Sequence, residues 1–161
     1  MILTGLAGFP LCSNEAINTI LYVKQQQAKN SGIKFTADIS EHYAVLPDDY
    51  DLCRLLNNII DNALNAALTA RENRQCRIEI AIDENEITIK SENNFIEKRT
   101  KPKTGDHGNG IGIIKEIAAK YGGEYVSRQE NDVWYTQTTL ANKKSSNSIP
   151  SPNFGLTTRF E

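Results

Sequence analysis

Apolar residues recur at helical spacing over one long segment of this chain, and this segment predicts its longest helix. Between 49 and 68 they occupy positions i, i+3, i+4 and i+7 over about five turns. Asp48 or Asp49 is placed to cap the N-terminus of this helix. The predicted buried face consists of Leu52, Leu55, Leu56, Ile59, Ile60, Ala63, Leu64, Ala67 and Leu68.

Two further segments have a helical pattern. Ser13 is placed to cap a helix that reaches about Lys29, and Gly32 fits the position just after its end. Its apolar face is formed by Ala16, Ile17, Ile20 and Leu21, with Lys24 and Ala28 on the same side. The last helix is predicted over 111–120 and ends at the Tyr-Gly-Gly of 121–123.

Strict alternation of apolar and polar residues predicts the strands. Residues 33–39 form a half-buried strand, and 78–82 with 87–89 form a hairpin around a short polar turn. Residues 124–128 and 133–140 form a second hairpin. Since the helices are few enough to cover one face only, we expect an α+β fold. It is a two-layer α/β sandwich with a mixed sheet covered on one face by helices.

The segments between these elements suggest the domain organisation. Residues 1–31 are expected to be a lead-in and the end of a dimerisation or linker helix, 32–141 a catalytic domain, and 142–161 a flexible tail. A short extended piece is expected at 43–46. The polar stretch 91–106 is too long for a plain connector, which is typical of a functional lid or of disorder. Its basic residues are Lys98, Arg99, Lys101 and Lys103.

Composition excludes few functional classes, but it indicates the compartment in which the protein works. The formal net charge of −2 over 161 residues argues against a general nucleic-acid binder. No apolar run approaches the roughly 18 residues of a membrane span. Cys12, Cys53 and Cys76 are scattered and form no CxxC pair, so neither a zinc site nor a disulfide framework is expected. Such cysteine usage fits a reducing cytoplasm.

Asparagine is unusually dense in the long predicted helix. Asn58, Asn62 and Asn65 are spaced i, i+4 and i+7, so they share one stripe, and Asp61 lies beside it. Asparagine is a poor helix former, so three along one stripe are costly without a purpose. Carboxamide oxygens are hard ligands that suit Mg²⁺. The alternative is a polar flank that only faces solvent.

A glycine-rich loop leads into the last predicted helix. Gly108, Gly110 and Gly112 allow the backbone to approach an anion, and the helix N-terminus adds free N–H groups. The loop is no dinucleotide fingerprint, because no strand directly precedes it, and no Gly-Lys-Ser/Thr makes it a P-loop. A hinge is the alternative interpretation.

Together and in this order, the two signals resemble the ATP-binding (GHKL) fold shared by gyrase, Hsp90, MutL and histidine kinases. Residues 55–63 (LLNNIIDNA) resemble its N box, and 107–111 (HGNGI) resemble its glycine box. The resemblance implies ATP and Mg²⁺ as cofactors, with Asn62 as the metal ligand. The cofactor-binding set that it implies is Asn58, Asp61, Asn62, Asn65, Asn93, His107, Gly108, Asn109, Gly110 and Ile111.

Four short motifs are similar to sensor histidine kinases that read peptide pheromones in Gram-positive bacteria. They are 51–54 (DLCR), 61–63 (DNA), 92–95 (ENNF) and the His-Gly-x-Gly of 107–110. Asn93 then matches the position that contacts the adenine amino group, where other members carry aspartate. Glu92 is the alternative if the strand register shifts by one residue.

Position 58 distinguishes kinases from hydrolases of this fold. Hydrolysing members carry a water-activating glutamate four residues before the metal asparagine, and here that residue is Asn58. A carboxamide is no general base at neutral pH. The resemblance therefore implies that Asn58 and Asn62, the two catalytic positions, hold ATP for phosphoryl transfer and not for hydrolysis.

The implied function is that of the catalytic ATP-binding domain of a two-component sensor histidine kinase. It would phosphorylate a histidine on a dimerisation domain of the same protein, since neither His42 nor His107 lies in a dimerising helix. We expect no autophosphorylation by this chain alone. A response regulator would be the next partner, in the cytoplasm, without direct nucleic-acid contact and with membrane attachment only through a sensor region. The alternative is a non-catalytic ATP-binding switch or degenerate kinase that acts through protein–protein contacts, as anti-sigma factors do.

Overall fold

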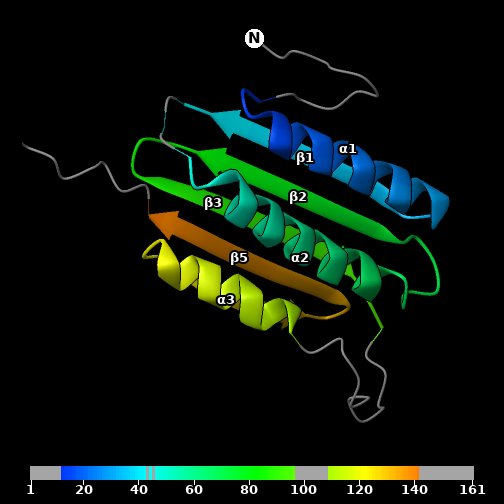
Figure 1. Cartoon of the computed structure of the whole chain (residues 1–161). Coiled ribbons are helices and arrows are strands. Elements are labelled where there is room, and N and C mark those ends of the chain that lie inside the picture. The colour runs from blue at the N-terminus through cyan, green and yellow to red at the C-terminus, as the bar shows by residue number, and fades with distance from the viewer. Residues whose placement is uncertain (1–11, 43, 45, 97–108, 142–161) are drawn as a thin grey trace, which may run out of the picture.

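The computed structural model describes residues 12–42, 44, 46–96 and 109–141. In this part of the chain, three helices cover one face of a single sheet (Figure 1). The elements are α1 (Glu15–Asn30), β1 (Lys34–Glu41), α2 (Asp49–Ala67), β2 (Gln75–Ile82), β3 (Glu86–Asn94), α3 (Gly110–Lys120), β4 (Tyr125–Glu130) and β5 (Val133–Ala141).

The sheet has the order β1-β2-β3-β5-β4. Strands β1 and β2 are parallel, and α2 is the crossover between them. The other three pairs, β2–β3, β3–β5 and β4–β5, are antiparallel. The predicted two-layer α+β sandwich with a mixed sheet is therefore confirmed.

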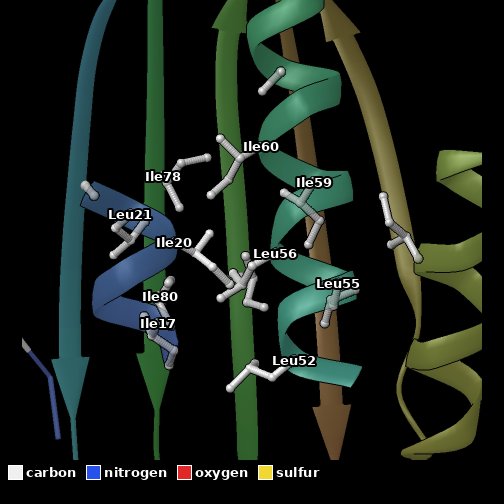
Figure 2. Packing of buried hydrophobic residues seen from close by; sticks show 14 of the residues in the cluster. Ile17, Ile20, Leu21, Leu52, Leu55, Leu56, Ile59, Ile60, Ile78 and Ile80 are labelled. Atoms are coloured by element: carbon white, nitrogen blue, oxygen red, sulfur yellow. The ribbon is translucent and has the colours of Figure 1, made fainter. Parts of the chain in front are cut away.

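The core lies between the helices and the sheet. Figure 2 shows Ile17, Ile20 and Leu21 of α1, with apolar side chains of α2, packed over Ile78 and Ile80 of β2. Every predicted apolar position of α2 is buried except Leu68, which caps the helix and is exposed. Because burial fixes the rotation of α2, Asn58 and Asn62 lie on the flank that faces the first residue of α3.

Helix α1 belongs to the same core as α2, since Ile17 and Leu21 are each only 1% exposed. It therefore packs as part of this domain. That residues 1–31 also end a dimerisation helix remains a prediction. None of the helices in the described part has both the length and the apolar composition of a membrane span.

Helix ends follow the predicted signals with one correction. Asp48 caps α2, where its carboxylate accepts the N–H groups of Tyr50 and Asp51. Asn14, and not Ser13, caps α1 by accepting the N–H of Ile17 at 2.9 Å. The hydroxyl of Ser13 donates instead to the carboxylate of Glu41, a partner distant in sequence.

Several strands are longer than their patterns predict. Strand β2 begins at Gln75 and not at Ile78, and β4 continues to Glu130. Strand β1 continues to Glu41, and β3 continues to Asn94, so 91–94 is strand and not the start of a loop. For β3 the reason is pairing with β5, which extends as far as Asn94 opposite Val133. For β1 it is pairing with β2, which extends as far as Glu41 opposite Ile82. Ala44 and Leu46 lie outside any strand. Predictions for 1–10, 97–106 and 142–161 fall outside the described residues.

Candidate functional site

Helix α2 presents two carboxamide oxygens on its exposed flank. The Nδ2 of Asn58 donates to the backbone carbonyl of Arg54 at 2.7 Å, which leaves its Oδ1 as the free end of the side chain. The side chain of Asn62, one turn further on, is exposed and makes no hydrogen bond within the described residues. The predicted stripe therefore holds two hard oxygen ligands without internal partners.

Gly110, the first residue of α3, lies directly against these oxygens. A Cβ at this position would lie 3.1 Å from Oδ1 of Asn58 and 3.2 Å from Oδ1 of Asn62. The N-cap residue Asn109 makes no side-chain cap bond. Within the described residues, the first N–H groups of α3 therefore receive no side-chain cap from Asn109, and they lie at the positive end of the helix dipole, where a ligand can bind them. The structure thus brings Gly110 of the predicted glycine loop together with Asn58 and Asn62 of the predicted stripe.

A pocket of about 260 Å³ opens between α2, α3 and the sheet. Three predicted site residues line it: Asn62, Asn93 and Ile111. Its other lining residues are Ile59, Ala63, Ala66, Ser91, Phe95, Ile114, Tyr125, Trp134 and Thr136. The pocket is mostly apolar with a few polar groups, which is typical of small-molecule sites.

Asn93 lies deep in this pocket and is 1% exposed. Its side chain donates to the backbone carbonyl of Asn94 at 3.1 Å. Only the NH₂ end can face a carbonyl oxygen, so the oxygen of Asn93 is the end left to accept a hydrogen bond. Glu92 lies on the other, helix-free face of the sheet, beside Arg77 and Tyr135. The strand register thus places Asn93, and not Glu92, toward the helices.

Two aromatic residues that line the pocket, Phe95 and Trp134, were not predicted as site residues from the sequence. Trp134 does lie in a strand, as its pattern predicts, but it also lines the pocket. Its ring meets Phe95 edge-on, with centroids 5.9 Å apart and planes at 89°. Only the register of the two strands reveals this role of Trp134. Trp134 of β5 pairs directly with Asn93 of β3, so the two side chains lie on the same face of the sheet.

The remaining predicted residues have other surroundings. Asp61 forms an ion pair with Lys24 of α1, with Oδ1 and Nζ 2.6 Å apart, and does not line the pocket. Asn65 is exposed and also lies outside the pocket lining. His107 and Gly108 fall outside the described residues.

Comparison with solved structures finds the same fold in histidine kinase catalytic domains. The catalytic domain of the histidine kinase ThkA matches at a TM-score of 0.65 and 17% identity, over 82% of this chain and 93% of that chain. The Acinetobacter baumannii histidine kinase AdeS matches at 0.61 and 12% identity, over 80% and 64% of the two chains.

A mycobacterial sensor histidine kinase, MprB, matches at 0.58 and 14% identity, over 79% of this chain and 96% of that chain. A search of curated proteins finds no match. The GHKL domain model matches residues 48–141, a span from α2 to the end of β5 that contains every described part of the site. The chain therefore belongs to the GHKL domain family and has the fold of histidine kinase catalytic domains.

Proposed function

We propose that this chain is the ATP-binding catalytic domain of a two-component sensor histidine kinase. The observation that carries the proposal is the contact of Gly110 with the carboxamides of Asn58 and Asn62. It places a helix N-terminus, which favours phosphate, against two oxygens that suit Mg²⁺. Membership of the GHKL family supports the same assignment.

The residues present fit both parts of a magnesium nucleotide. Asn62 would hold the metal, which usually takes few protein ligands and keeps water and phosphate oxygens as the others. The first turn of α3, from Gly110, would bind the phosphates through its free N–H groups. The side-chain oxygen of Asn93 would accept a hydrogen bond from the adenine amino group in the apolar pocket beside Trp134.

The identity of residue 58 as asparagine favours phosphoryl transfer from ATP over hydrolysis of ATP. The Nδ2 of Asn58 is bound to Arg54, and its oxygen cannot take a proton from water at neutral pH. Phosphoryl transfer needs mainly positioning and charge neutralisation, which the metal supplies when bound. The acceptor would be a histidine on a dimerisation domain of the same protein, in the cytoplasm.

A response regulator is the partner proposed for the next step. A solved structure holds the histidine kinase ThkA in complex with the response regulator protein TrrA, and this chain matches 41% of that kinase chain at a TM-score of 0.62. Asn93 further supports membership of the peptide-pheromone subgroup, whose motif carries asparagine where other kinases carry aspartate.

Titration calorimetry of ATP, with and without Mg²⁺, tests the proposal. We expect magnesium-dependent binding that Asn62→Ala abolishes and Asn62→Asp retains in part, because a carboxylate oxygen can still ligate the metal. Asn57→Ala is the matched control, since Asn57 is on the same helix but bonds the carbonyl of Cys53. No binding by a folded chain at millimolar ATP would overturn the proposal.

Transfer is tested separately from binding. The chain is mixed with the dimerisation domain encoded by the same gene, and transfer of labelled phosphate from ATP to its histidine is measured. Labelled histidine supports the kinase. ATP binding without transfer favours the second candidate, an ATP-binding switch that acts on a protein partner.

A further inference from the structure

Helix α3 is bound to α2 at the end remote from Gly110. The Nζ of Lys120 donates to Oδ2 of Asp51 at 2.5 Å, and the hydroxyl of Tyr121 donates to the same oxygen at 2.8 Å. The hydroxyl of Tyr121 also accepts the N–H of Asp48 at 3.3 Å. We call Asp51, Lys120 and Tyr121 the α2–α3 clamp.

Asp51 is the centre of this clamp. It is only 4% exposed, whereas the side chain of Lys120 is 61% exposed. Hydrogen bonds from Lys120 and then Tyr121 hold the pKa of the Asp51 carboxyl below its usual range. Arg54 adds a second cation, with Nη1 3.8 Å from Oδ1 of Asp51. A buried carboxylate is stable only with such partners, so the clamp has a defined geometry.

The two helices run in opposite directions and meet at two places. Helix α3 has 11 residues, and such a helix is about 16 Å long. Its last turn lies in the clamp and its first residue, Gly110, lies against Asn58 and Asn62. Because backbone hydrogen bonds join the about three turns of α3, we expect release of its last turn to shift its first turn as well.

We propose that the α2–α3 clamp is a positioning device for the nucleotide site, in which Asp51 sets the placement of Gly110 against Asn58 and Asn62. The inference rests on the proposed function, because its consequence is on ATP binding. None of the three clamp residues lines the pocket, so they can act on it only through the helices that they join.

The test combines Lys120→Met with Tyr121→Phe, which removes the two side-chain donors at the end of α3 and leaves the buried carboxylate of Asp51 without them. We expect faster amide hydrogen exchange at the first turn of α3. We also expect the Kd for ATP with Mg²⁺ to rise about tenfold, since apparent affinity falls with the fraction of molecules in the competent state. Lys120→Arg alone keeps the charge and the donor, so the exchange rate and the Kd should stay at their wild-type values.

A control separates positioning from a general loss of stability. Ile17→Val removes a buried methyl group from α1, away from α3, and so lowers the stability of the core. It should leave the Kd for ATP and the amide exchange rate of α3 unchanged. An unchanged Kd in the double variant, with α3 loosened, would overturn the positioning role while the proposed function stands. If the wild-type chain binds no ATP, the proposed function fails. The amide hydrogen exchange of the double variant then tests the clamp by itself. Faster exchange at Gly110 supports the clamp, and unchanged exchange overturns it.

Discussion

Asn93 and Trp134 face one another as direct cross-strand partners of β3 and β5, and both line the pocket between the sheet and α3. One is a buried carboxamide and the other an aromatic ring. The pair thus combines a polar group with a flat apolar surface, the combination that a purine base requires. It suggests that the base lies at this end of the pocket, and the phosphates near Gly110.

Trp134 offers a direct optical test, because it is the only tryptophan of the chain. We expect its fluorescence to change as ATP is added in the presence of Mg²⁺, and the change to saturate with the Kd found by calorimetry. Trp134→Leu should weaken binding by about 1–3 kcal/mol, the cost of losing an aromatic contact with a base. If the emission spectrum of Trp134 stays unchanged at saturating ATP, the base does not bind beside Trp134.

Gly110→Ala should separate folding from binding. Alanine is a better helix former by about 0.5–1 kcal/mol, so Tm should hold or rise. The added Cβ displaces the carboxamides of Asn58 and Asn62, which lie 3.1 and 3.2 Å away. We expect the Kd for ATP to rise about tenfold, or 1.4 kcal/mol. Lys115→Ala, on the exposed side of α3, is the control, and equal affinities for both variants would contradict the interpretation.

Removal of Asp61 should lower the free energy of unfolding more than removal of its ion-pair partner Lys24. Lys24 is 7% exposed, whereas the side chain of Asp61 is 41% exposed. Asp61→Ala should cost about 2–4 kcal/mol, because it leaves a buried ammonium without its carboxylate. Lys24→Met should cost less than about 1 kcal/mol, because the remaining carboxylate is hydrated. Urea unfolding of both variants measures the difference, and equal costs would refute this account.

Acid should weaken the fold through Asp51. Its pKa is lowered in the folded state, first by Lys120 and then by Tyr121. The resulting stability is fully present above the unfolded pKa, which is about 3.9. It is lost as the pH falls through the lower, folded value. Thermal unfolding from pH 7 to pH 3 should show a smaller loss of Tm in Asp51→Asn than in the wild type, and parallel curves would exclude Asp51 as the cause.

Local periodicity was sufficient for most of the fold. The buried face of α2 and the hairpin of β2 with β3 follow from patterns within a few residues, so both lie where they were predicted, although β2 begins at Gln75 and not at Ile78. The last residues of β3 do not, because Ser91 to Asn94 look polar and gain their strand geometry from β5. Such pairing depends on residues far away in sequence.

The site was predictable only in part for the same reason. Asn58 and Asn62 share a helix face, and spacing alone places them together. Trp134 and Asn93 share a face only through the register of two distant strands. Asp61 was predicted to belong to the cofactor-binding set beside Asn62, but its partner Lys24 is 37 positions away and on another helix.

Strand β5 is the last described strand of the chain, yet it lies inside the sheet, between β3 and β4. A nascent chain that has left the ribosome only as far as β4 therefore has an unpaired edge along β3, beside an unfinished pocket. Such edges are where partly made proteins aggregate. Because Trp134 arrives with β5, the complete pocket wall exists only once this strand has been inserted. Nucleotide binding would then report that synthesis had passed this point.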